Sequence, residues 1–235
     1  MPLFEMKNVS FIDNFTTVVQ DISLSIEKGT VTAFLGEPGG GKSTILKLLA
    51  GLMIPSYGKI YIDQKDFSRF SEKDNMEFRK KSAFMFQNSA LWANQSLYQN
   101  LELPLKIHFP NMPPELLKSK IEDAAKLVEF TKPLSLRPAA LSIGEQKRIA
   151  FARALICEPE ILFLDEPTES LNEKAAALFT NILKDFCQNG HTLIYVSHDY
   201  NFINAFKNDK YYFANGTIVD KILINEDIQE DYNEI

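Results

Sequence analysis

Residues 30–49, TVTAFLGEPGGGKSTILKLL, decide the fold of this 235-residue chain. The stretch opens with a short apolar run typical of a buried parallel strand. It passes through a glycine-rich turn and ends in apolar residues at helical spacing. The turn, residues 36–44, fits the G-x-x-x-x-G-K-[ST] pattern of a phosphate-binding loop. A strand, this loop and a helix in succession predict an α/β nucleotide-binding fold.

The loop predicts a site for nucleotide phosphates. Its glycines let the backbone amides converge on the β- and γ-phosphates, and Lys42 adds a positive charge. Ser43 is expected to ligate Mg²⁺, and Glu37 to point away from the phosphates, which would repel its carboxylate. The expected nucleotide-binding set is Gly36, Glu37, Pro38, Gly39, Gly40, Gly41, Lys42, Ser43 and Thr44. The alternative, a glycine-rich turn that merely precedes a lysine, is disfavoured by the flanking strand and helix.

Composition narrows the class of protein. With 45% hydrophobic residues the chain can bury a full core, and its net charge of -6 argues against a nucleic-acid partner. Cys157 and Cys187 have no metal-type spacing, which predicts buried thiols in a reducing compartment. Neither a signal peptide nor an apolar run of membrane-spanning length is found. We therefore expect a soluble protein that reaches a membrane only through a partner.

Residue patterns divide the chain into three parts. Alternating apolar residues in 4–12 and 18–26 predict antiparallel strands near the N-terminus. Prolines and amphipathic segments predict an inserted helical subdomain over residues 87–159. After it, alternation of strands and helices resumes, and YYFANGTIV at 211–219 reads as the closing strand. We expect a single domain, a P-loop NTPase (RecA-like) core with an N-terminal antiparallel β subdomain: residues 1–86 and 160–225 form the α/β core, and 226–235 a loosely held acidic tail.

Two carboxylates follow the apolar run ILFL within residues 161–167. This run predicts a buried strand, so Asp165 and Glu166 fall at its carboxyl end, where α/β proteins bind ligands. Adjacent strand residues face opposite ways. One carboxylate can therefore reach the Mg²⁺ shell while the other polarises water near the γ-phosphate. The alternative, two acids that cap a helix, is disfavoured by the phosphate loop.

Residues 141–150, LSIGEQKRIA, allow two interpretations. Ser142 can cap the first turn of a helix, and Glu145 completes a capping box. Gly144 lets another molecule approach the backbone closely, and the positive end of a helix attracts anions. The residues alone leave open whether this is an ordinary helix start or a second anion site.

Taken in order along nearly the whole chain, these motifs resemble those of the ATP-binding cassette (ABC) ATPases. The matching segments are GEPGGGKST (Walker A), Gln87 (Q-loop), LSIGEQ (signature), ILFLDEP (Walker B), ESLN (D-loop) and His198 (switch histidine). The resemblance implies an ATPase that binds ATP and Mg²⁺. Its metal ligands would be Ser43, Gln87 and Asp165, and its catalytic residues Glu166, His198 and Gln87. For His198, a polar histidine at a strand end is the alternative.

The same resemblance implies partners. Two cassettes would pack head to tail, so that Ser142, Gly144 and Glu145 of one subunit complete the ATP site of the other. A membrane permease would hold the protein on the cytoplasmic face of the cell membrane. Phe15 is our choice for stacking on adenine. Ile143 stands where the family usually has glycine and Asn172 where it usually has aspartate, which predicts slow or partner-dependent turnover and a lost charge across the dimer.

The transported substrate is suggested by two local similarities. Residues 86–105 resemble the Q-loop region of Mla-type phospholipid-transporter ATPases, whereas 144–155 and 165–172 lean toward the lipoprotein-releasing, macrolide-efflux and FtsE-like branch. Both imply lipid or envelope work. Leu91 or Trp92 is expected to line a groove for the permease, with packing in the subdomain core as the alternative. A non-transport ABC ATPase and a P-loop kinase remain open.

Overall fold

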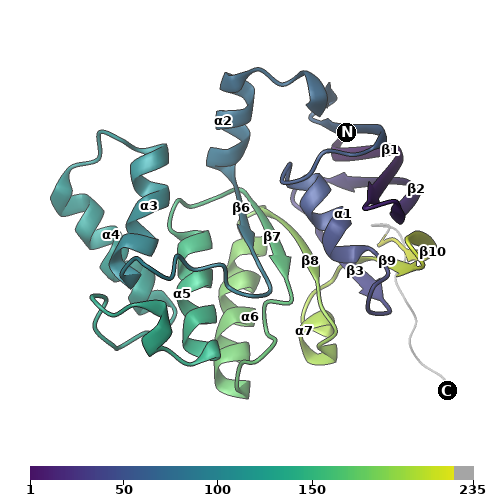
Figure 1. Ribbon diagram of the computed structural model, residues 1–235. Helices are drawn as coiled ribbons and strands as arrows, with labels where there is room; N and C mark the ends of the chain where they lie inside the picture. The colour runs from purple at the N-terminus through teal and green to yellow at the C-terminus, as the bar shows by residue number, and fades with distance from the viewer. Residues whose placement is uncertain (225–235) are drawn as a thin grey trace.

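The computed structural model describes residues 1–224, so the predicted acidic tail lies outside the described residues. Two sheets form the scaffold (Figure 1). The smaller sheet is antiparallel, in the order β2-β1-β4-β5. Its strands are β1 (Pro2–Asp13), β2 (Thr16–Glu27), β4 (Tyr57–Ile62) and β5 (Lys65–Asp66). The antiparallel N-terminal subdomain predicted from the alternating pattern is therefore confirmed.

The larger sheet has the order β10-β9-β3-β8-β7-β6 and is parallel except at the β9–β10 edge. Its strands are β3 (Val31–Gly36), β6 (Ser82–Met85), β7 (Ile161–Asp165), β8 (Thr192–Val196), β9 (Asp209–Ala214) and β10 (Thr217–Ile222). Residues 211–219 close the sheet, as expected, but they belong to two strands, β9 and β10. The chain reverses at Asn215 and Gly216, both at positive φ, and forms a hairpin.

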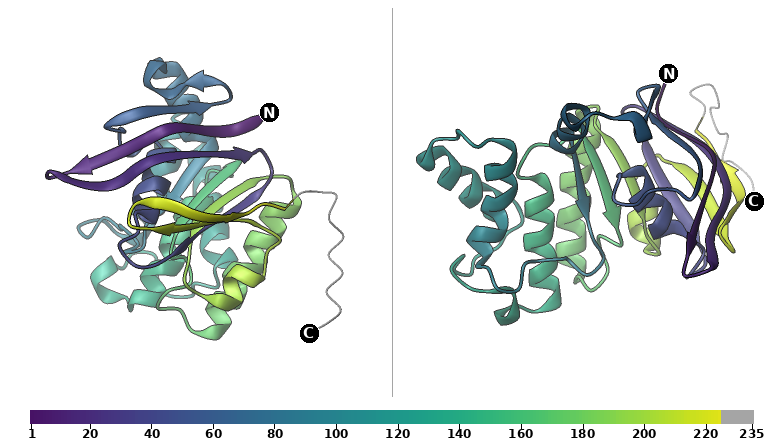
Figure 2. Two further views of the ribbon diagram at one scale, coloured as in Figure 1. Left: turned by 90° about the vertical axis from the view of Figure 1, so that its right-hand side faces the viewer. Right: turned by 45° about the horizontal axis from the view of Figure 1, so that its top comes forward.

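Helices cover both faces of the larger sheet (Figures 1 and 2). One helix, α1 (Lys42–Leu49), lies between the two sheets, and α5 (Ile143–Leu155) and α6 (Glu173–Gln188) pack on the opposite face. Beyond α5 lie α3 (Leu97–His108) and α4 (Pro114–Leu127). The remaining helical elements are η1 (Phe67–Arg69), α2 (Glu72–Lys81), η2 (Pro138–Ala140) and α7 (Tyr200–Asn204).

Helix α2 was not expected from the sequence. Its residues EKDNMEFRKK have no apolar period, and Phe78 is its one buried residue. The helix instead begins with a capping box, in which the Ser71 hydroxyl accepts from the backbone N–H of Asp74 and the Asp74 carboxylate accepts from that of Ser71. Capping rather than an apolar stripe therefore marks its start.

Two hydrophobic cores flank the larger sheet, and β7 serves both. Leu162 and Leu164 face the core formed with the helices, while Ile161 and Phe163 face the core shared with α1 and the smaller sheet. This alternation follows from the two-residue period of a strand. Because β7 is held on both faces, the position of its carboxyl end is well determined.

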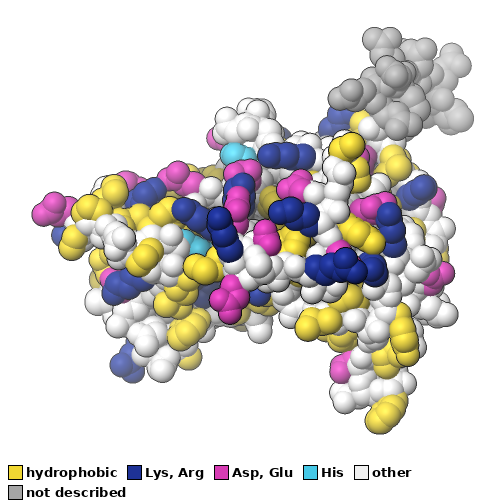
Figure 3. All heavy atoms as spheres, turned by 90° about the horizontal axis from the view of Figure 1, so that it is seen from above, with side chains coloured by type: hydrophobic (Ala, Val, Ile, Leu, Met, Phe, Trp, Pro, Cys, Tyr) yellow, Lys and Arg dark blue, Asp and Glu magenta, His cyan; other side chains and the backbone are white. Residues whose placement is uncertain are grey.

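Charged side chains are mixed on the surface seen from above in Figure 3. Ion pairs such as Lys7–Glu5 (3.1 Å) and Lys81–Glu77 (3.3 Å) join neighbouring charges, and such exposed pairs contribute little to stability. Within residues 1–224 no helix is both long and apolar enough to cross a membrane. The thiols of Cys157 and Cys187 are free and only partly buried, where full burial was expected, and burial raises their pKa to about 11 and about 12.

Candidate nucleotide site

The phosphate loop connects β3 to α1, and the side chain of Lys42 hydrogen-bonds back to the start of the loop. Lys42 is buried, and its Nζ donates to the carbonyls of Gly36 (2.9 Å) and Glu37 (2.6 Å). Gly41 has φ 90°, and a Cβ there would stand 2.9 Å from the Val18 carbonyl oxygen, so the close approach to β2 requires glycine. The side chain of Glu37 is exposed, in line with the expectation that it points outward.

The Lys42 charge is supported by nearby acids. Burial lowers the pKa of Lys42, and attraction to Glu166 and Asp165 opposes that shift. The ammonium therefore lies close to two carboxylates, in a pocket that gathers opposite charges. This arrangement supplies a fixed positive charge at the start of α1.

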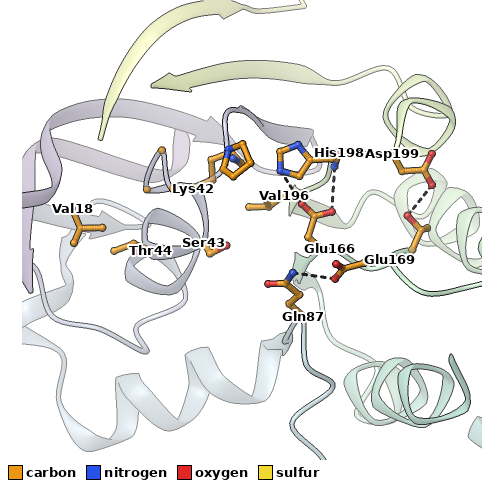
Figure 4. Close-up of a pocket in the computed structure, with 15 residues that line it drawn as sticks. Val18, Lys42, Ser43, Thr44, Gln87, Glu166, Glu169, Val196, His198 and Asp199 are labelled. Carbon is orange, nitrogen blue, oxygen red and sulfur yellow. Dashed lines mark hydrogen bonds and ion pairs between the residues drawn. The ribbon is translucent and has the colours of Figure 1, made fainter. Parts of the chain in front are cut away.

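The two acids at the end of β7 contact different groups, although Glu166 follows the strand in a left-handed backbone conformation (φ 49°). The Ser43 hydroxyl donates to Asp165 Oδ1 at 2.8 Å. Glu166 turns the other way: its Oε2 accepts from the backbone N–H of His198 at 3.2 Å, and its Oε1 lies 3.4 Å from His198 Nε2 (Figure 4). Burial raises the pKa of both carboxyls, opposed by the Ser43 hydrogen bond at Asp165 and by His198 at Glu166.

Gln87 lies on the facing side of the pocket, beyond the end of β6. Its Nε2 donates to Glu169 Oε2 at 3.0 Å, which leaves its amide oxygen without a described donor (Figure 4). Together these groups surround a cavity of about 570 Å³. Its lining comprises Val18, Pro38, Gly39, Gly40, Gly41, Lys42, Ser43, Thr44, Gln87, Glu166, Thr168, Glu169, Val196, His198 and Asp199.

The donor set suits a magnesium ion. Ser43 and Asp165 place a hydroxyl and a carboxylate oxygen side by side, and Mg²⁺ prefers oxygen ligands, few of them from protein when phosphates supply the rest. No group of three or more His, Cys, Asp or Glu residues able to hold a metal occurs within residues 1–224. A magnesium site that is completed by substrate phosphates does not need such a group of protein ligands.

The signature residues lie apart from this cavity. Ser142, Gly144 and Glu145 line a second cavity, which shares no lining residue with the first. The predicted capping box is present, because the Ser142 hydroxyl accepts from the Glu145 backbone N–H and the Glu145 carboxylate accepts from that of Ser142. Gly144 also packs closely, since a Cβ there would stand 3.2 Å from the Ser170 carbonyl oxygen. Within one chain, the helix start and the phosphate loop remain separate.

Three other expectations concern exposed or capping residues. Phe15 lies fully exposed in the turn between β1 and β2 and does not line the cavity. Ile143 is exposed as well, whereas Asn172 caps α6 by accepting from the Ala175 backbone N–H at 2.9 Å. Trp92 is 53% exposed, so it is not a core residue.

Several lining residues were not predicted. Thr168 and Asp199 adjoin motif residues and bond to each other, the Thr168 hydroxyl donating to Asp199 Oδ2 at 2.9 Å. Their position next to motif residues in the sequence was the signal that could have identified them as lining residues. Val18 and Val196 are strand residues that gave none, since nothing in an apolar strand pattern marks one residue as lining a site.

Comparison with protein families gives a match to the model described as ABC transporter over residues 19–169. The ABC transporter ATP-binding protein YtrE of Bacillus subtilis is 34% identical over 189 residues, covering 80% of this chain and 81% of that protein. The methionine import ATP-binding protein MetN of Clostridium acetobutylicum is 32% identical over 197 residues. That match covers 83% of this chain but 61% of MetN, so this chain spans less than two thirds of that relative.

Two further similarities extend the comparison. The intermembrane phospholipid transport system ATP-binding protein MlaF of Haemophilus influenzae is 29% identical over 218 residues, covering 92% of this chain and 82% of that protein. Among solved structures, the ATP-binding cassette MJ0796, a dimer in a post-hydrolysis state bound to ADP and Pi, has a TM-score of 0.86 and 27% identity. It covers 93% of this chain and 97% of that one. By its family match, its relatives and its fold, this chain belongs to the ABC transporter family as one of its ATP-binding ATPase domains.

Proposed function

We propose that this chain binds Mg·ATP in the cavity between the phosphate loop and the ends of β7 and β8, and hydrolyses it to drive a membrane permease. The main support for this proposal is that the two carboxylates at the end of β7 contact different groups. Asp165 bonds the loop serine Ser43, and Glu166 bonds His198 on the other side. Asp165 thus contacts the loop serine, while Glu166 lines the cavity beside His198.

Binding and activation are assigned to different residues. The loop amides and Lys42 hold the phosphates, while Ser43, Asp165 and Gln87 offer oxygen ligands for the metal. When bound, Mg²⁺ neutralises phosphate charge and the charge that develops during transfer. Of the two amide atoms of Gln87, only Nε2 has a described partner, and its Oε1 is the atom available for this role.

Glu166 is assigned as the group that accepts a proton from the attacking water. Burial raises its pKa, which makes the carboxylate a better base. The backbone N–H of His198 holds one oxygen and leaves the carboxylate turned into the cavity. The imidazole of His198, half exposed beside it, is placed to contact the γ-phosphate.

Dimerisation through the signature residues is part of the proposal. Support comes from the separation of the two cavities, because the signature cavity of a chain does not reach its own phosphate loop. A second copy placed head to tail would bring Ser142 and Gly144 to that loop. Phe15, exposed at the edge of the smaller sheet, is then our choice for the adenine contact.

A mixed dimer tests this arrangement. One subunit carries Ser142→Arg and the other Lys42→Ala, which puts both defects into one composite site and leaves the other site intact. We expect hydrolysis in the mixed dimer and almost none in either singly substituted homodimer. Inactivity of all three samples would show that each signature serves its own chain.

The permease contact is assigned to the segment after Gln87. Leu91 packs against the helical core, whereas Trp92 exposes half its surface, so Trp92 is the better candidate for a groove that receives a membrane partner. Trp92→Ala should leave Tm and ATP affinity unchanged and weaken co-purification with the permease. A large fall in Tm with the permease contact intact would contradict this.

A lipid or envelope substrate is the proposed cargo. Support comes from the resemblance of residues 86–105 to the Q-loop region of Mla-type phospholipid-transporter ATPases. It comes also from the similarity of the chain to MlaF, a protein named for intermembrane phospholipid transport. Amino-acid import is the competing class, because MetN and the L-cystine import protein TcyC of Bacillus subtilis (34% identical) are relatives too. Stimulation of the reconstituted complex by phospholipid, with none by methionine or cystine, would support the lipid assignment, and the reverse would overturn it.

A further inference from the structure

Lys147 is a buried cation that the assigned roles do not use. It lies on α5, in the second turn after the signature capping box, and its side chain is 1% exposed. Its Nζ donates to the carbonyl oxygen of Glu166 at 2.6 Å and to that of Glu169 at 2.9 Å. The same nitrogen lies 3.9 Å from Glu169 Oε2. One ammonium group therefore contacts both ends of the turn that follows β7.

Burying a charged lysine costs free energy of folding unless its ammonium group is paired and hydrogen-bonded. Burial lowers the pKa of Lys147, and attraction to Glu169, Glu166 and Asp165 opposes the shift, which favours the charged form. Two carbonyl oxygens accept hydrogen bonds from the Lys147 ammonium, and the Glu169 carboxylate lies at ion-pair distance from it. All the described partners of this ammonium are oxygen acceptors.

The turn that Lys147 holds has an unusual backbone. Glu166 has φ 49° and Ser170 φ 63°, in the left-handed region that residues other than glycine rarely adopt. Such conformations persist where surrounding contacts determine them. The Glu166 carbonyl bonded by Lys147 belongs to the residue whose side chain enters the nucleotide cavity. Fixing that carbonyl restricts the direction of the Glu166 side chain.

Lys147 also acts on the opposite wall of the cavity. Glu169 Oε2 accepts from Gln87 Nε2 at 3.0 Å (Figure 4). The same oxygen lies 3.9 Å from Lys147 Nζ, so the Lys147 charge is close to the carboxylate that orients Gln87. A single buried side chain on the signature helix is thus linked to Glu166 through the backbone and to Gln87 through Glu169. Within residues 1–224 no other lysine hydrogen-bonds the backbone carbonyls of both Glu166 and Glu169.

We propose that Lys147 is a positioning residue for ATP hydrolysis, setting the orientation of Glu166 and Gln87 from the signature helix. The inference rests on the proposed function, in which Glu166 activates water. It predicts that loss of the ammonium affects turnover much more than nucleotide binding, because neither Lys42 nor Ser43 contacts Lys147.

The test compares Lys147→Met, Lys147→Gln and a control, Lys174→Met, in the full chain. Methionine keeps much of the length and removes every donor, while glutamine restores part of the hydrogen bonding. Lys174 pairs with Glu129 at 3.1 Å on the exposed surface, and neither side chain lines the nucleotide cavity. We expect kcat to fall about tenfold or more in Lys147→Met, equal to ~1.4 kcal/mol in the barrier.

Other readouts separate positioning from general damage. The ATP Kd should change less than about threefold in Lys147→Met, because the substitution does not alter the residues that bind the phosphates. Lys147→Gln should recover part of the lost kcat, and Lys174→Met should match the wild type. Amide hydrogen exchange of residues 166–170 should be faster in Lys147→Met without nucleotide, since the held turn is released.

The outcomes are distinguishable. Wild-type protein that hydrolyses no ATP would overturn the proposed function. Active wild type with unchanged kcat in both Lys147 variants, or a parallel loss of kcat and ATP affinity in both, would overturn the positioning role. If Lys147→Met melts early, Lys147→Gln decides: lower kcat at wild-type Tm and Kd supports the role, and wild-type kcat overturns it.

Discussion

Replacing Glu166 with glutamine should stop turnover and leave nucleotide bound. In the structure one carboxylate oxygen accepts from the His198 backbone N–H at 3.2 Å, and the other lies 3.4 Å from His198 Nε2. An amide keeps an oxygen for the N–H and places its NH₂ opposite the ring nitrogen, so the side chain keeps its place but loses its basicity. A positioned general base contributes about 10²–10⁴-fold, so kcat should fall at least ~100-fold, or ~2.7 kcal/mol.

Nucleotide affinity supplies the internal check. Lys42 and Ser43 form no hydrogen bond to the Glu166 side chain, and removal of a negative charge lessens repulsion of the phosphates. The ATP Kd should therefore stay constant or decrease. Phosphate release gives kcat, nucleotide titration gives Kd, and Glu173→Gln at the exposed start of α6 is the matched control. Turnover by Glu166→Gln at the wild-type rate would refute the assignment, as would loss of binding alongside loss of turnover.

Two further predictions concern stability. Ser142→Ala removes the cap of α5 and should lower the free energy of unfolding by about 0.5–2 kcal/mol in a denaturant melt, because an N–H of the first turn loses its acceptor; an unchanged midpoint would contradict the capping role. Burial raises the pKa of Asp165 above its unfolded value, so ligand-free protein loses stability as pH rises through the folded-state pKa. Asp165→Asn should therefore have the higher Tm at pH 7, with this advantage lost below about pH 4, near the unfolded pKa; a constant difference across this range would point to packing instead.

Local motifs made much of the site predictable. The phosphate loop and the β7 acids are short segments whose residues are covalently close, so strand and turn geometry alone determines which groups meet. Asp165 and Glu166 contact different groups in the structure, but Glu166 lies beyond the end of β7 at φ 49°, so the strand period alone does not set its direction. The antiparallel subdomain followed equally from alternating apolar residues.

Tertiary effects explain what the sequence did not reveal. Helix α2 forms by capping and buries Phe78 alone, so no apolar period marks it. A lysine within a helix ordinarily faces solvent, and only the packing of α5 beneath the β7 turn makes Lys147 a buried cation. The spacing of motifs along the chain likewise does not give the distance in space between the signature residues and the phosphate loop.

The position of β3 in the larger sheet has a consequence for biosynthesis. This strand carries the phosphate loop, yet both of its neighbours come late in the chain: Val31 pairs with Leu193, and Thr32 with Asp209. Pairing between such distant segments carries a large loop-closure entropy and slows folding. During translation the apolar β3 therefore waits without a sheet partner until β8 and β9 have emerged from the ribosome. The ATP site is therefore completed only late in synthesis, and the unpaired apolar β3 is prone to aggregation in that interval.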